Sequence, residues 1–197
     1  MPLHDRIIGH FQASAHTALE AADTLAPHIE QAARLMVHCL AQGGKIMACG
    51  NGGSAAGAQH FTAQMVNRFE QERPGLAAIA LTTDTSILTS IANDYAYDQV
   101  FARQVKVLGQ PGDILLAIST SGNSPSVLQA VAAAHARNVH VIVLTGRNGG
   151  MLTEQIVEDD VFLCVPAESV ARIQEIHLLT IHCLCDAVDS VLLGVEE

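Results

Sequence analysis

The chain has no tryptophan, and aromatic residues of all kinds make up only 4% of its 197 residues. Because 49% of the residues are nevertheless hydrophobic, a buried core must be built mostly from Ala, Val, Ile and Leu. This hydrophobic content is ample for a core, and the length is typical of one α/β domain or of such a domain with added helices.

Basic residues are also scarce, since ten Lys and Arg stand against twenty Asp and Glu, for a formal net charge of -10. A surface of this sign repels phosphate backbones and anionic lipid headgroups. We therefore expect neither direct nucleic-acid binding nor binding to a membrane surface. A protein partner is not excluded by this charge.

The five cysteines are odd in number, and each lies in an apolar run. Disulfides are therefore not expected, and a reducing compartment fits better. We interpret all five as small buried hydrophobic residues: Cys39, Cys49, Cys164, Cys183 and Cys185. No apolar stretch looks long enough to span a membrane, and the N-terminus begins no long apolar run, so we expect a cytoplasmic protein.

Hydrophobic periodicity alternates between helical and strand-like along the chain. Residues 3–40 have helical periodicity, with a break expected near Ala26 and Pro27. Short buried strands are predicted at 45–49, 75–81, 114–118, 139–144 and 161–165. Helices are predicted at 54–70, 85–92, 98–108, 125–137, 151–156 and 172–193, with Asn93 and Asp94 as a break after the second. This alternation predicts an α/β fold with a five-stranded parallel sheet and helices on both faces.

Two regions do not fit a plain α/β domain. Residues 1–42 form an N-terminal helical extension, and the last helix is apolar around too much of its circumference for the surface of a monomer. Both features favour helix packing between subunits. Since we find no internal repeat, low-complexity tract or linker, residues 1–197 are interpreted as a single domain.

The strand predicted at 114–118 runs into a loop rich in hydroxyl groups, Ser119-Thr120-Ser121-Gly122-Asn123-Ser124, after which a helical pattern starts. Helix capping would need one Ser or Asn, and four hydroxyls in six residues exceed that need. Backbone N–H groups at a helix N-terminus favour anions. Because the loop has no Lys or Arg, it predicts a site for a small phosphate monoester held by neutral hydrogen bonds.

A second polar loop, Gly50-Asn51-Gly52-Gly53-Ser54, follows the strand predicted at 45–49. Its glycines allow a ligand to approach the backbone closely, although a tight strand-to-helix turn would explain them as well. It is not a Walker loop, because no Gly-Lys-Ser or Gly-Lys-Thr follows. Two polar loops at strand carboxyl ends of one parallel sheet are where ligands bind in open α/β folds, so together they favour a small anionic ligand.

Polar side chains on two helices are candidates for chemistry. His60 and Gln64 share one helix face, because they are four residues apart, although a lone histidine is more often a buried or capping residue. The final helix carries a polar stripe: Arg172, Gln174, Glu175, His177 and His182. Gln174 and His182 are separated by about 12 Å along the axis. One metal ion could reach both only if the side chains lean together or subunits share the site, and a polar interface stripe explains them equally well.

Taken together, these segments resemble the sugar isomerase (SIS) domain family over nearly the whole chain. The match is to its phosphoheptose isomerase branch, which includes isomerase-like regulators of chromosome replication. The residues that carry the resemblance are 49–55, 59–61, 67–69, 92–94, 118–124, 144–146 and 172–177. The resemblance implies a flavodoxin-like three-layer sandwich, and a homotetramer with active sites at subunit interfaces.

The resemblance also implies roles for individual residues. Sugar phosphate would bind to Asn51, Gly52, Gly53, Ser54, Asn93, Asp94 and Gln174, with its phosphate on Ser119, Thr120, Ser121 and Ser124. The family's divalent metal, usually zinc, would contact His60, Gln64, Gln174 and His182. The implied reaction converts sedoheptulose 7-phosphate to D-glycero-D-manno-heptose 7-phosphate, the first step toward lipopolysaccharide core heptose.

One catalytic position departs from the family pattern. Active isomerases have Glu four residues after the helix histidine, where this chain has Gln64. Isomerisation needs a base and an acid, and an amide is neither near pH 7, although its oxygen can contact a metal as a neutral donor. We therefore consider an isomerase impaired by Gln64, with His182 as acid and base. The alternatives are a non-catalytic tetrameric adaptor that binds the replication initiator protein DnaA, and a sensor that binds a sugar phosphate without reaction.

Overall fold

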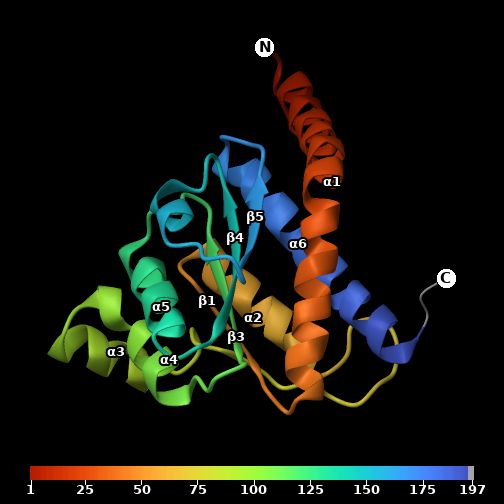
Figure 1. The fold of residues 1–197 in the computed structure, drawn as a ribbon. Helices are drawn as coiled ribbons and strands as arrows, with labels where there is room; N and C mark the ends of the chain where they lie inside the picture. The colour runs from red at the N-terminus through yellow and green to blue at the C-terminus, as the bar shows by residue number, and fades with distance from the viewer. Residues whose placement is uncertain (195–197) are drawn as a thin grey trace.

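Five parallel strands form one sheet, in the order β2-β1-β3-β4-β5, in the computed structural model, which describes residues 1–194 (Figure 1). This topology confirms the predicted α/β class. The elements along the chain are α1 (Leu3–Ala41), β1 (Ile46–Gly50), α2 (Gly53–Val66), β2 (Ala78–Ala80), α3 (Thr85–Asp94), η1 (Tyr97–Gln99), α4 (Ala102–Leu108), β3 (Ile114–Ser119), α5 (Pro125–His135), β4 (His140–Gly146), η2 (Gly150–Glu154), β5 (Val161–Val165) and α6 (Val170–Leu193).

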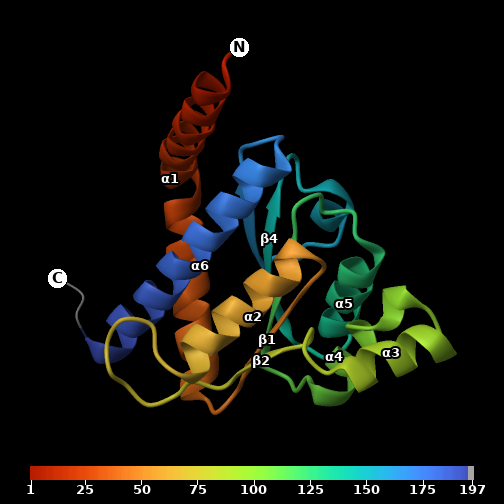
Figure 2. The ribbon, with the colours of Figure 1, turned by 180° about the vertical axis from the view of Figure 1, so that it is seen from behind.

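Helices lie on both faces of the sheet, which gives three layers. Figures 1 and 2 show α1, α2 and α6 on one face and α3, α4 and α5 on the other. β1 and β3 are buried along their whole length because both of their faces are covered. Both cores are mainly Ala, Val, Ile and Leu, as the composition predicts. Of the five cysteines, Cys164 and Cys183 are only half-buried, which corrects the interpretation that all are core residues.

α1 is one continuous helix through Pro27, so the predicted break near Ala26 is wrong. A proline in a helix interior costs about 3 kcal/mol, because one backbone hydrogen bond is lost. Pro27 itself is exposed, whereas Leu25 before it and Ala32 after it are buried in the core. Burial on both sides of the proline therefore outweighs its local cost. The predicted helical extension of residues 1–42 is a single helix, whose first turns project beyond the sheet (Figure 1).

Several predicted boundaries also move. α2 ends at Val66 rather than near residue 70, and the helix predicted at 98–108 is a 3₁₀ turn followed by the shorter α4. Asn93 and Asp94 do not break a helix but are the last two residues of α3. The helix continues through them because the backbone N–H of Tyr95 donates to the carbonyl of Ile91.

α6 has the length and composition of a helix that could cross a membrane, with a mean hydropathy of 1.6 over its most apolar window. This corrects the expectation that no stretch is long enough. In the fold, α6 packs against α1 and α2, and residues such as Ile173 and Leu184 along its length are buried in the core.

The strand order changes direction at β1, because β2 pairs on one side of it and β3 on the other. Gly50 at the end of β1 lies opposite Ile118 near the end of β3, so the loops after these two strands leave the same edge of the sheet side by side. The crevice at such a switch point is the usual ligand site of an open parallel sheet. The glycine-rich loop and the serine-rich loop meet at this point.

Candidate functional site

The serine-rich loop after β3 lines a cavity of about 180 Å³ at the switch point. All four of its predicted phosphate-binding residues line this cavity, together with two residues of the glycine-rich loop and one strand residue: Ser119, Thr120, Ser121, Ser124, Asn51, Ser54 and Ile118. These side chains are all uncharged. An anion here would therefore be held by hydroxyl, amide and backbone donors, as the sequence predicts.

The loop after β4 holds the serine-rich loop in place. Gly122 has a positive φ of 66°, and a Cβ at this position would lie 1.7 Å from the carbonyl oxygen of Gly149. The side chain of Asn123 joins the two loops, because its Oδ1 accepts from the backbone N–H of Met151 at 2.9 Å and its Nδ2 donates to the carbonyl of Ser121 at 3.1 Å. Only glycine fits at position 122, and the shape of the loop is fixed before any ligand binds.

Asn51 of the glycine-rich loop is hydrogen-bonded at every polar atom of its side chain. Its Nδ2 donates to the hydroxyls of Ser124 and Ser126, both at 2.8 Å. Its Oδ1 accepts from the hydroxyl of Tyr97 at 2.9 Å. Asn51 therefore links η1 to the serine-rich loop across the switch point.

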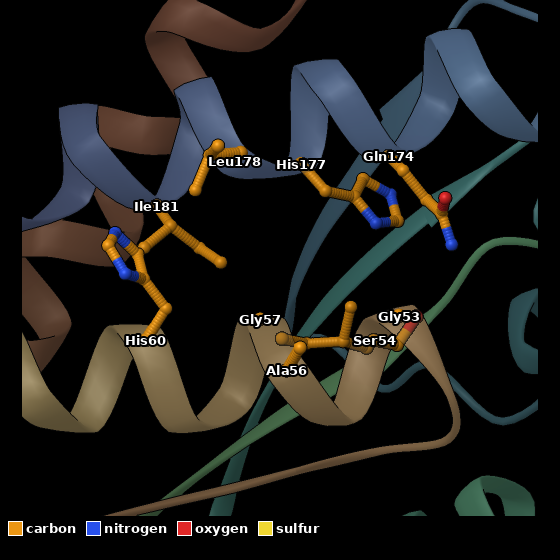
Figure 3. Close-up of a pocket in the computed structure, with 10 residues that line it drawn as sticks. Gly53, Ser54, Ala56, Gly57, His60, Gln174, His177, Leu178 and Ile181 are labelled. Carbon is orange, nitrogen blue, oxygen red and sulfur yellow. The ribbon is translucent and has the colours of Figure 1, made fainter.

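A second cavity, of about 420 Å³, lies between α2 and α6 (Figure 3). It shares Ser54 and Ile118 with the serine-lined cavity, so the two adjoin. At one end of it Gln174 packs against Gly53, where a Cβ on Gly53 would lie 2.4 Å from the amide nitrogen of Gln174. His60 lines the cavity from α2, near its other end in the view of Figure 3. Together the cavities make one elongated site, with hydroxyls at one end and an imidazole at the other.

His60 of α2 and His182 of α6 contact each other directly. Their Nε2 atoms are 2.9 Å apart, so one ring donates a hydrogen bond and the other accepts it. The amide nitrogen of Gln64 lies 3.4 Å from Nε2 of His60, and the ring of Phe69 packs against His182. Burial, and secondarily the nearby His182, lower the pKa of His60, which is therefore neutral at pH 7 and able to accept a proton.

The predicted sugar-binding residues do not all line the two cavities, since Gly52 is exposed at the N-terminus of α2 and lines neither. Gln174 lines the second cavity against Gly53, but within residues 1–194 no hydrogen bond joins it to the histidine pair. Asn93 and Asp94 are exposed at the end of α3, where the amide of Asn93 donates to the carboxylate of Asp94 at 3.0 Å. Neither lines the two cavities just described. A single subunit thus brings together the serine-rich loop and the histidine pair, but it does not bring all of the predicted sugar-binding and metal-binding residues to one site.

The histidine pair is suited to hold part of a metal site. Two nitrogens that bind one tetrahedral zinc ion lie about 3.3 Å apart, so the two Nε2 atoms at 2.9 Å would need to move by only tenths of an ångström. Gln64 could add an amide oxygen as a third, neutral ligand. Within residues 1–194, no group of three or more His, Cys, Asp or Glu side chains is arranged to hold a metal ion. The residues of one subunit that could hold a zinc ion are therefore His60, His182 and Gln64, and Gln174 of the same subunit is not among them.

Sequence reasoning missed Arg73, which joins the two helices of this site. Its buried guanidinium pairs with Asp189 of α6 and donates to the carbonyls of Gln64 and Met65, both at 3.0 Å, at the end of α2. One signal was available, because Asp189 is a carboxylate in an otherwise apolar stretch of helix, and such a group must find a partner. Nothing in the sequence near Arg73 distinguished it from a solvated loop residue.

Comparison with known families gives a match to the SIS domain over residues 10–146. Curated relatives align along their whole length with the whole of this chain. They include a phosphoheptose isomerase of Thiobacillus denitrificans, 82% identical over 197 residues, and one of an Azoarcus species, 62% identical over 197 residues.

Solved structures agree with these sequence matches. The phosphoheptose isomerase GmhA of Neisseria gonorrhoeae superposes with a TM-score of 0.92 and 53% identity, covering 96% of this chain and 100% of its own. A phosphoheptose isomerase of Francisella tularensis gives a TM-score of 0.94 and 48% identity, with the same coverage of both chains. The similarity therefore covers almost the whole length of this chain.

Proposed function

The chain belongs to the SIS domain family and, within it, to the phosphoheptose isomerases, and from that premise we propose that it interconverts sedoheptulose 7-phosphate and D-glycero-D-manno-heptose 7-phosphate. The reaction is an aldose–ketose isomerisation. The observation that carries the proposal is the joining of a hydroxyl-lined cavity to a cavity that His60 lines, with His182 in direct contact with His60. A phosphorylated sugar matches both ends of this site.

The phosphate end would be bound by Ser119, Thr120, Ser121 and Ser124 at the start of α5. Neutral donors suit a substrate that must leave after each turnover, because they form no buried ion pair with it. The sugar would extend past Ser54, which lines both cavities, toward His60. This orientation places the carbonyl end of the sugar at the histidine pair.

Isomerisation moves one proton between C1 and C2 of the sugar, through an enediolate, and one proton between the oxygens on these carbons. His182 is proposed as the group that removes the carbon-bound proton and returns it, with the hydrogen bond from Nε2 of one histidine to the other holding the rings in position. His60, kept neutral by its lowered pKa, can share the proton that His182 accepts. When zinc is present, His60, His182 and Gln64 would hold it in place of the hydrogen bond between the two rings, and it would supply polarisation of the sugar carbonyl.

Gln64 is expected to weaken both parts of this chemistry. Its amide neither accepts a carbon-bound proton nor brings a negative charge to the metal, whereas the glutamate expected from the family pattern would do both. The absence of a positioned base typically lowers a rate about 10²- to 10⁴-fold. We therefore propose a phosphoheptose isomerase whose turnover is limited at position 64.

The test is the conversion of sedoheptulose 7-phosphate by the unaltered protein and by the Gln64→Glu variant, each with and without added zinc. We expect slow turnover by the unaltered protein and about 10²- to 10⁴-fold faster turnover by the variant. The matched control is Gln71→Glu, which adds the same charge at an exposed loop position and should change nothing. If neither protein turns over, the proposal is wrong.

A second candidate function is that of a non-catalytic adaptor for the replication initiator protein DnaA. It is favoured by one observation, the uncharged amide beside His60 where proton transfer is proposed. The net charge of -10 agrees with a protein partner rather than DNA. Retention of DnaA on the immobilised protein at physiological salt would support the adaptor, and its absence would count against it.

Assembly as a homotetramer is part of the same proposal. Large apolar side chains exposed on α1 and α6, such as Phe11 and Leu178, support it. We also propose a cytoplasmic location, because all five thiols are free and the proposed substrate is a metabolic intermediate.

A further inference from the structure

Tyr97, in the short η1 turn, reaches the phosphate end of the site without lining either cavity. Its side chain is largely exposed, and its hydroxyl donates to Oδ1 of Asn51 at 2.9 Å. Asn51 in turn donates from Nδ2 to Ser124, a residue of the serine-lined cavity. A chain of two hydrogen bonds therefore runs from the surface of the protein to a proposed phosphate ligand.

The direction of these hydrogen bonds decides what Ser124 can offer to a ligand. While Nδ2 of Asn51 donates to it, the oxygen of Ser124 is the acceptor, and its own proton can point into the cavity or toward Ser126 at 3.3 Å. If the amide of Asn51 turned over, Oδ1 would face Ser124 instead. The serine would then donate its proton to Asn51, and the phosphate would lose a donor.

Tyr97 is the group that favours the first orientation. Its phenolic hydroxyl donates to Oδ1 and could also accept, but a phenol is a better donor and a weaker acceptor than an aliphatic hydroxyl, so it favours an oxygen partner. The two serines beside Nδ2 are aliphatic hydroxyls that accept either orientation of the amide. Ser126 is buried and lies 3.3 Å from Ser124, so it belongs to the same network. A phenylalanine at position 97 would leave the amide without this preference.

We propose that Tyr97 is a positioning residue for phosphate recognition, which acts through Asn51 to keep the hydroxyl proton of Ser124 available to the phosphate group of the substrate. The inference rests on the proposed function, since it assigns the phosphate end of the sugar to the serine-rich loop. It adds a residue outside the loop, from a different element, whose one side-chain hydrogen bond within residues 1–194 is to Asn51.

The test compares Tyr97→Phe with the unaltered protein. One hydrogen bond contributes about 0.5–1.5 kcal/mol, so we expect roughly a three- to tenfold rise in KM for sedoheptulose 7-phosphate, with kcat changed by less than about twofold. Protection against thermal unfolding by inorganic phosphate should need a similarly higher phosphate concentration, and this second measurement requires no turnover. The matched control is Tyr95→Phe, because Tyr95 is equally exposed and contacts Arg103 rather than the site.

A double-mutant cycle with Ser124→Ala distinguishes a relay from general loosening of the loop. If Tyr97 acts through Ser124, Tyr97→Phe should have no further effect on KM or on phosphate protection in the Ser124→Ala background. The relay alone would be overturned if Tyr97→Phe and the unaltered protein had the same KM and the same phosphate protection. Additive effects of the two substitutions in the cycle would overturn it as well. Failure of the unaltered protein to bind either phosphate compound would instead reject the proposed function, and the relay with it.

Discussion

The imidazole of His177 is buried between α6 and the sheet, with only 4% of its surface exposed. Its Nε2 lies 3.0 Å from the carbonyl oxygen of Thr145 in β4, so the neutral ring donates a hydrogen bond there. Burial lowers the pKa of His177 to about 4, and the bond to Thr145 opposes this only in part. A residue that reads as part of a polar stripe therefore fixes α6 to the sheet.

Acid should destabilise the protein through this single residue. Below pH 6.5 the unfolded chain binds a proton that the folded His177 does not take up until about pH 4, so the free energy of unfolding falls as the pH is lowered through this window. The loss approaches about 3 kcal/mol at pH 4. His177→Gln keeps a donor for Thr145 without titrating, and urea unfolding at pH 7 and pH 5 should show a smaller loss in the variant. An equal loss in both proteins would contradict this assignment.

Among the structural elements, α2 and α6 matter most for the site, because they carry the two histidines. Arg73 holds them together at one end, where its guanidinium binds the last carbonyls of α2 and pairs with Asp189 of α6. The side chains of both partners, Arg73 and Asp189, are nearly inaccessible to solvent. The 67–77 segment between α2 and β2 is thus anchored from within rather than by its surface charges.

Removal of this anchor should be costly. Arg73→Met would leave the carboxylate of Asp189 buried without a counter-charge, and we expect the free energy of unfolding to fall by about 3–5 kcal/mol. The matched control is Arg103→Met, because Arg103 is exposed. Its free energy of unfolding should fall by less than about 1 kcal/mol. The double variant Arg73→Met with Asp189→Leu should recover part of the loss, because it removes the unpaired charge. Denaturant titrations measure all three, and a single variant as stable as the double would refute the account.

At the scale of the whole molecule, the first turns of α1 stand away from the three layers (Figure 1). Leu3, Ile7 and Phe11 are exposed there, and their four-residue spacing places them on one side of the helix. Exposed apolar side chains of this kind, which α6 also carries in Leu178 and Leu179, are typical of surfaces that bury against other subunits. It supports the proposed homotetramer.

Interruption of this apolar surface should change the assembly state. We expect Phe11→Asp to shift the protein from a tetramer to smaller species in sedimentation velocity experiments, because a charge would have to be buried at the subunit contact. Gln12→Asp places the same charge one residue away and should leave the tetramer intact if Gln12 lies outside the contact. A monomeric unaltered protein, or a tetrameric Phe11→Asp, would contradict the assignment of this surface.

The sequence by itself determined the α/β class, the order of the elements and the hydroxyl-lined loop at a strand end. These follow from local periods of burial and from residues adjacent in the chain, which act over one strand or one helix turn. It also placed His60 and Gln64 on one helix face. The same local rules predicted a break at Pro27 that does not occur, because burial elsewhere along α1 outweighs the cost of the proline.

Only the tertiary structure decided which distant residues meet. His60 and His182 are 122 residues apart and contact each other because α2 and α6 pack on the same face of the sheet, while Gln174 on the same helix lies against Gly53 instead. Tyr97 and Asn51 meet for the same kind of reason, as do Arg73 and Asp189. Such contacts depend on how helices lie against a twisted sheet, and no period within one segment encodes that packing.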